Sequence, residues 1–137
     1  MRSAARIDNF LPIPNQRVEI RTGPESGRGV FARRSIASGT EIEAAPVIVL
    51  PAAECRLLDR TIIHNYYFHW DGDPDGEGRG ALGLGLVSLC NHSRCPRARV
   101  DRNFARLTLD LIAIAEIAAG EEITIDYGCE LWFEPHD

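Results

Sequence analysis

Apolar residues in this chain come in short runs, most of them bounded by glycine, proline, asparagine or aspartate. Runs of a few aliphatic and β-branched residues between such breaks are typical of β-strands. In one run Leu107, Leu109 and Leu111 alternate with Thr108 and Asp110, which predicts a half-buried strand. The runs that we expect to form strands are 18–20, 41–43, 47–50, 107–114 and 122–125.

Helical character is confined to one segment, residues 52–60, which follows Pro51 and has a helix-friendly composition. Two turn sequences, 36–42 and 117–123, resemble each other, and each places a glycine before a strand. Seven residues are too few to establish a repeat, so this likeness serves only to locate turns. The predicted fold class is mainly β with minor helix.

The length of 137 residues predicts a single domain spanning residues 1–137. Residues 1–15 carry charges and have no continuous apolar core, which is unlike a secretory signal. No run reaches the roughly eighteen apolar residues of a membrane span. The four cysteines form no CxxC pair, so we expect free thiols. Together these features predict a soluble, intracellular protein, cytoplasmic or nuclear, that does not contact a membrane.

The net charge of −5 argues against a general nucleic-acid binder and leaves room for a basic peptide as partner. All fifteen basic residues are arginine and none is lysine. The chain therefore has no lysine side chain that could itself be modified.

Two glycine-containing segments match ligand-binding motifs incompletely. Residues 71–76 resemble the start of a calcium loop, but the twelfth position, which should be a bidentate glutamate, is Leu82. We interpret the segment as a solvated acidic loop. Residues 78–83 satisfy GxGxxG, but a dinucleotide site also requires a strand before the motif and a helix after it. An acidic turn precedes this motif, so we set the dinucleotide interpretation aside.

Cys90, His92 and Cys95 offer zinc-binding atoms, but their spacing lacks the paired knuckles of zinc sites, and we predict no metal. A small buried hydrophobic role is favoured for Cys90. Nothing local marks Ser88 or Ser93 as an activated nucleophile, which argues against a hydrolase.

Three separated motifs occur in a fixed order: Gly27-Arg28-Gly29-Val30-Phe31, Asn91-His92-Ser93, and Gly120-Glu121-Glu122-Ile123-Thr124-Ile125-Asp126-Tyr127-Gly128. Together they resemble the signature of SET-domain protein-lysine methyltransferases, in particular the compact viral and bacterial type. The resemblance covers a motif-bearing core of about 18–133. It implies a β-clip fold of several small curved sheets. It also implies a C-terminal pseudoknot, in which the chain with the Asn-His-Ser motif and the chain ending in the tyrosine thread past each other.

The resemblance also implies a cofactor, S-adenosylmethionine, with S-adenosylhomocysteine as the product. Main-chain contacts to its methionine end would come from Arg28, Gly29 and Val30. Asn91 and His92 would contact its adenosyl and amino-acid ends.

Five aromatic residues receive roles from the same resemblance. Tyr127 would be the catalytic residue and would also contact the cofactor at its sulfonium. Tyr66 and Tyr67 would line a lysine channel, Tyr66 most directly, because a regular strand turns only one of them inward. Trp132 or Phe133 would close over the adenine or the channel mouth, and we assign Trp132 to the cofactor and Phe133 to the channel.

The implied reaction transfers a methyl group to a lysine of a basic protein, histone or histone-like. Some relatives carry a second tyrosine where this chain has Leu131, which leaves the number of methyl groups open. A homodimer is a further expectation, since some compact relatives pair to complete their sites. The alternative hypothesis is a non-catalytic SET-fold module that binds a basic peptide.

Overall fold

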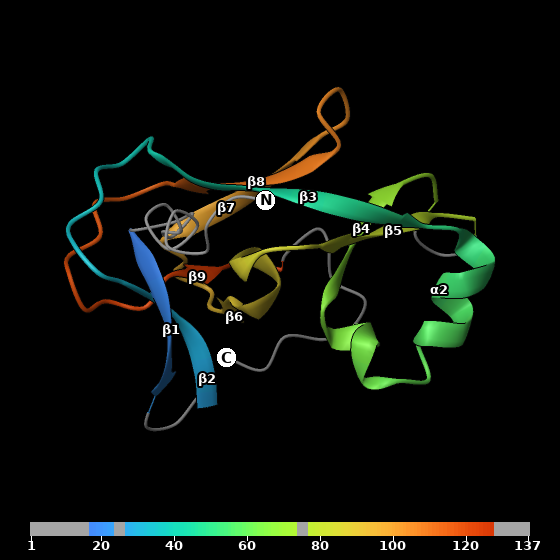
Figure 1. Ribbon diagram of the computed structural model, residues 1–137, viewed down its shortest axis with the longest axis horizontal. Coiled ribbons are helices and arrows are strands. Elements are labelled where there is room, and N and C mark those ends of the chain that lie inside the picture. Colours follow the sequence, from blue (N-terminus) through green and yellow to red (C-terminus); the bar gives the residue numbers. More distant parts are fainter. Residues whose placement is uncertain (1–16, 24–26, 74–76, 128–137) are drawn as a thin grey trace, which may run out of the picture.

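The computed structural model describes residues 17–23, 27–73 and 77–127, and within them short strands predominate (Figure 1). The strands are Val18–Gly23 (β1), Gly27–Ala32 (β2), Glu41–Leu50 (β3), Tyr67–Asp71 (β4), Arg79–Gly83 (β5), Asn91–His92 (β6), Ala98–Asn103 (β7), Thr108–Ala113 (β8) and Thr124–Ile125 (β9). The helical elements are Ala52–Leu58 (α2) and two 3₁₀ turns, Ile62–Asn65 (η1) and Leu86–Leu89 (η2). The predicted class, mainly β with minor helix, is confirmed.

Strand β3 is the longest and joins two parts of the main sheet (Figure 1). Residues 41–46 of β3 pair with β8, and residues 47–50 pair with β5. The strand order among the described residues is β4-β5-β3-β8-β7-β9-β6, and β1 and β2 form a separate antiparallel pair. The core lies where these two sheets meet, and its largest fully buried side chains include Trp70, Leu109, Leu111 and Ile117.

The predicted helix at 52–60 is confirmed, although regular α-helix ends at Leu58 and Asp59 caps it. None of the described helices is both long and apolar enough to cross a membrane.

The alternation predicted around Leu109 is wrong in one respect, because both faces of β8 are covered. Thr108 and Asp110 are each only 7% exposed. Their burial is tolerated because Asp110 Oδ1 accepts a 2.7 Å hydrogen bond from the Thr108 hydroxyl, and Asp110 Oδ2 accepts one of 3.1 Å from the Asn103 amide. Leu107 lies before the strand, in the β7–β8 turn, with φ 57°.

The glycines of the GxGxxG match serve packing in a hairpin. Gly80 and Gly83 lie in β5, which pairs antiparallel with β4. A Cβ at Gly80 would lie 2.7 Å from Cδ1 of Tyr67, and one at Gly83 would lie 2.7 Å from Cγ1 of Val87. At the end of this hairpin where the loop connects the two strands, Asp71 is paired with Arg79, so its carboxylate already has a cationic partner.

The two similar turn sequences occupy equivalent positions around a local twofold relation. Ile36 and Ile117 exchange backbone hydrogen bonds of 2.8 and 2.9 Å with each other. Three residues after each isoleucine, Gly39 and Gly120 adopt φ values of 91° and 90°. The Gly39 N–H donates to the Ala113 carbonyl and the Gly120 N–H donates to the Ala32 carbonyl, each at 2.8 Å. The likeness of the two turns therefore reflects a shared structure.

The two motif-bearing segments of the second half of the chain lie side by side. Strand β6 pairs parallel with β9, with Asn91 opposite Thr124 and His92 opposite Ile125. Ile125 also pairs with Ala98 of β7, so β9 lies between β6 and β7. This confirms the adjacency that the pseudoknot requires, and the residues after Tyr127 that would complete the crossing lie outside the described residues.

We expect Gly39→Ala and Gly120→Ala each to lower the free energy of unfolding by about 1–2 kcal/mol, the cost of a left-handed conformation for a residue with a Cβ. Nothing lies within 4 Å of a Cβ built at either position, so steric collision adds nothing. Urea unfolding followed by circular dichroism measures the change. The control Ser38→Ala, at an exposed residue of the first turn, should change the free energy by less than about 0.5 kcal/mol. A large loss at one glycine and none at the other would contradict their equivalence.

Candidate active site

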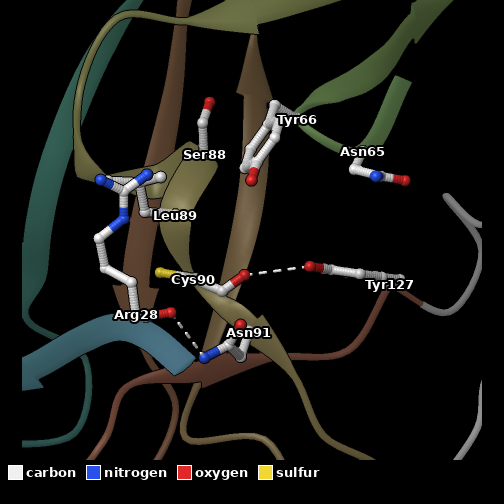
Figure 2. Close-up of a pocket in the computed structure, with 8 residues that line it drawn as sticks. All are labelled: Arg28, Asn65, Tyr66, Ser88, Leu89, Cys90, Asn91 and Tyr127. Carbon is white, nitrogen blue, oxygen red and sulfur yellow. Dashed lines mark hydrogen bonds between the residues drawn. The ribbon is translucent and has the colours of Figure 1, made fainter. Parts of the chain in front are cut away.

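One cavity of about 260 Å³ brings together segments that are far apart in the sequence (Figure 2). Its walls come from β2, from the end of η1, from the η2–β6 segment and from the residue two positions after β9. The lining residues are Arg28, Asn65, Tyr66, Ser88, Leu89, Cys90, Asn91 and Tyr127. Members of all three sequence motifs therefore contribute to this one space.

Tyr127 is fixed at both its backbone and its hydroxyl. Its hydroxyl donates a 3.0 Å hydrogen bond to the Cys90 carbonyl, and its N–H donates one of 3.1 Å to Nδ1 of His92. Figure 2 shows the hydroxyl ends of Tyr66 and Tyr127 both directed toward that carbonyl. Burial, reinforced by Cys90 and Tyr66, raises the pKa of Tyr127 above its ordinary value. The phenol is therefore protonated at neutral pH and acts as a hydrogen-bond donor.

His92 contacts Tyr127 through a hydrogen bond to its backbone and through its ring. Since Nδ1 accepts the Tyr127 N–H, this nitrogen carries no proton. The two rings lie 5.0 Å apart between centroids. The Asp126 carboxylate is 3.8 Å from the same nitrogen, beyond hydrogen-bond distance.

Asn91 connects the second motif to the first and the third. Its amide nitrogen donates to the Arg28 carbonyl at 3.2 Å and to Oε2 of Glu122 at 2.6 Å. The absence of a side chain at Gly29 leaves room for this arrangement, because a Cβ there would lie 2.8 Å from the Asn91 amide nitrogen and would collide with the Glu122 carboxylate.

Tyr66 and Tyr67 have different surroundings, as a chain with alternating side chains requires. Tyr66 lines the cavity. Tyr67 is only 6% exposed, packs with Leu50 and Cys55 in a second apolar cluster, and donates its hydroxyl to Asp59 at 2.6 Å. The structure therefore does not bring Tyr67 to the cavity, and the channel role predicted for it is not supported.

A sequence model described as "SET domain" matches residues 27–128 of this chain. The chain belongs to the SET-domain family. It is accordingly a protein-lysine methyltransferase, a family activity for which S-adenosylmethionine is the implied methyl donor.

Two further similarities agree with this assignment. The chain is 34% identical over 125 residues to a Schizosaccharomyces pombe protein named "Histone-lysine N-methyltransferase, H3 lysine-37 specific", covering 90% of this chain and 82% of that protein. It also resembles the fold of a Plasmodium falciparum protein whose crystal structure is provisionally described as a histone methyltransferase. That similarity has a TM-score of 0.63 at 24% identity, and covers 85% of this chain and 97% of the other.

Several residues expected from the SET resemblance do not line the cavity, and two others lie outside the residues that the structure describes. Val30 is fully buried in the core, and its carbonyl accepts the Ile123 N–H at 2.8 Å. Gly29 and His92 adjoin residues that line the cavity without lining it themselves. Trp132 and Phe133 lie outside the described residues.

The sequence reasoning missed five residues of this SET site. Cys90 was treated only as a buried apolar group, yet its carbonyl accepts the Tyr127 hydroxyl. Glu122 was quoted in a motif without a role, and Asn65, Ser88 and Leu89 were not assigned to the cavity that they line. The sequence offered one indication for Asn65, its position next to Tyr66. It offered none for the Cys90 carbonyl, because every residue has a backbone carbonyl.

We expect iodoacetamide at pH 8 to alkylate Cys95 and to leave Cys90 unmodified in the native protein. Cys95 is exposed, whereas Cys90 is 3% exposed and burial raises the pKa of its thiol well above the ordinary value. Peptide mass spectrometry measures both sites, and in urea both should react. Equal labelling of the two native thiols would mean that the Cys90 side of the cavity wall is open to solvent.

Proposed function

We propose that this cavity is where S-adenosylmethionine and a substrate lysine meet, and that Tyr127 is the catalytic residue. The observation that carries the proposal is the convergence of the Tyr127 hydroxyl, the Tyr66 ring and the Cys90 carbonyl in one cavity that Arg28 and Asn91 also line. The first three groups suit an amine and its methyl group, and the last two suit the polar ends of the cofactor.

The residues on the β2 side fit the chemistry of this cofactor. The Arg28 guanidinium offers donors for its carboxylate. Gly29 leaves a space that a Cβ would fill, beside the Asn91 amide. When bound, the cofactor supplies a methyl group activated by a positively charged sulfur.

The reaction needs a neutral lysine amine, although a free lysine has a pKa of about 10.4 and is mostly protonated at neutral pH. Aromatic walls from Tyr66 and Tyr127 reduce the solvation of an ammonium ion, which favours loss of its proton. The Cys90 carbonyl has a second lone pair besides the one that accepts the Tyr127 hydroxyl, and it can accept an amine N–H or a methyl C–H. Tyr127 and Cys90 thus orient the amine, and most of the rate enhancement comes from alignment.

The substrate in this proposal is a lysine of a basic, histone-like protein. The net charge of −5 complements a basic partner, and a 34% identical relative is named for a lysine of histone H3. An intracellular location follows from such a substrate and belongs to the same proposal. The homodimer stays a prediction. Nothing among the described residues favours the non-catalytic alternative, because Tyr127 and its hydrogen-bond acceptor are both in place.

We expect Tyr127→Phe to lower kcat by about 10²–10³-fold, the usual effect of removing a hydrogen-bond donor that acts in the transition state. The measurement is transfer of labelled methyl to lysine in a basic protein such as a histone H3 peptide. Because the chain contains no lysine, lysine label cannot come from the enzyme itself. Affinity for S-adenosylhomocysteine, measured by calorimetry, should stay within about twofold, since the hydroxyl bonds to protein. Full activity of this variant would contradict the role of Tyr127, and absence of turnover by the unaltered protein on all basic substrates would contradict the proposed reaction.

We expect Arg28→Met to weaken binding of S-adenosylhomocysteine about tenfold or more, because a charge-assisted hydrogen bond contributes about 1.5–3 kcal/mol. Methionine keeps an unbranched apolar side chain at this position, so packing changes little. The matched control is Arg99→Met, which removes an exposed arginine paired with Asp101. An equal loss in the two variants would indicate a general charge effect and no specific role for Arg28.

A further inference from the structure

Asp59 holds the segment that forms one wall of the cavity, although it does not line the cavity. It caps the C-terminal end of α2, and the chain continues from it through η1 to β4. Its Oδ1 atom accepts two hydrogen bonds, one of 2.6 Å from the Tyr67 hydroxyl and one of 2.8 Å involving Nδ1 of His64. Since a carboxylate only accepts, the His64 nitrogen must carry the proton.

These two hydrogen bonds bracket the wall. His64 and Tyr67 are the immediate neighbours of Asn65 and Tyr66, the two residues of this segment that line the cavity. A single carboxylate oxygen therefore restrains the chain on both sides of the wall residues. The rings of His64 and Tyr67 also meet edge to face, with centroids 6.3 Å apart.

The Tyr67 side of this arrangement has little freedom. Its ring is buried with Leu50 and Cys55, and it lies so close to Gly80 that no other residue would fit there. Tyr67 thus anchors Asp59 to the sheet, and Asp59 in turn holds His64. Tyr66 lies between these two points, so its direction into the cavity depends on both.

We propose that Asp59 is a positioning residue that sets the place of Tyr66 and Asn65 in the lysine channel, through its paired hydrogen bonds to His64 and Tyr67. The inference rests on the proposed function of the cavity. Its consequence for the reaction is specific: Asp59 affects how the substrate amine is held, and does not affect the cofactor side around Arg28 and Asn91.

The kinetic experiment uses Asp59→Ala, Asp59→Asn and the control Asp101→Ala on the full chain. Asp101 has a similarly exposed side chain, 47% against 42%, and makes its ion pair with Arg99. We expect Asp59→Ala to raise KM for the lysine peptide and lower kcat, together about tenfold, which is below the roughly hundredfold loss that a 1 Å misplacement can cause. Asp59→Asn should recover part of the loss because its carbonyl still accepts a hydrogen bond. Affinity for S-adenosylhomocysteine should be unchanged in all three variants.

A second arm needs no turnover and so separates this inference from the proposed reaction. Hydrogen exchange should accelerate in residues 62–67 of Asp59→Ala, where the Tyr66 N–H is bonded to the Ile63 carbonyl at 2.8 Å, and should stay unchanged around β6 and β9. If the unaltered protein has no activity but exchange changes in this pattern, the proposed reaction fails and the positioning role stands.

A combined variant guards against misfolding as an explanation. In a Tyr67→Phe, His64→Ala background both donors are gone, so adding Asp59→Ala should cause little further change in kinetics or exchange. The inference is overturned if Asp59→Ala behaves like Asp101→Ala. It is also overturned if exchange accelerates throughout the chain, or if the effect of Asp59→Ala is undiminished in the combined background.

Discussion

The candidate active site depends on the parallel pairing of two very short strands, β6 and β9. This pairing aligns Asn91-His92 with Thr124-Ile125. Tyr127 follows two residues after β9, and its hydroxyl reaches the Cys90 carbonyl. Two residues on each side contribute little stability by themselves. The pairing persists because Ile123 and Ile125 are buried in the core and because β7 pairs with β9 on its other side. The geometry of the candidate site is thus maintained by packing that is remote from the cavity.

The twofold relation between the turns at 36–42 and 117–123 explains how the last segment reaches this position. Reciprocal hydrogen bonds between Ile36 and Ile117 fix where the final segment starts. The Ala32 N–H bonds to the Glu121 carbonyl, and the Ile123 N–H bonds to the Val30 carbonyl, so β2 guides the chain toward β9. The same contacts place Glu122 beside Asn91, where its carboxylate accepts a hydrogen bond from the Asn91 side-chain amide. One set of backbone interactions therefore positions both the cofactor side and the tyrosine.

The sequence was sufficient for the fold class and the motif segments, but it placed both Tyr66 and Tyr67 in the channel, and of these two only Tyr66 lines the cavity. It was also insufficient for features that depend on contacts between segments far apart in the chain. Motif residues could be predicted because their identities are unusual in that order. The burial of Thr108 and Asp110 could not, because it depends on Asn103 meeting Asp110 across the β7–β8 hairpin. Asp59 also gave no signal, since one aspartate inside the predicted helix at 52–60 does not indicate which side chains it will contact. The role of the Cys90 carbonyl is independent of its side chain, and no sequence pattern encodes it.

The distribution of charge around the cavity explains why two carboxylates support the site from outside it. No acidic side chain is among the described residues that line the cavity, and Arg28 is the charged residue there. A carboxylate inside would stabilise a lysine ammonium and so oppose the neutral amine that methyl transfer requires. Asp59 and Glu122 instead lie outside the lining of the cavity, where they accept hydrogen bonds from Tyr67 and Asn91 respectively. The cavity can therefore be rigid without being acidic: its inner surface consists mainly of neutral donors, acceptors and aromatic rings, and ionised groups behind it hold that surface in place.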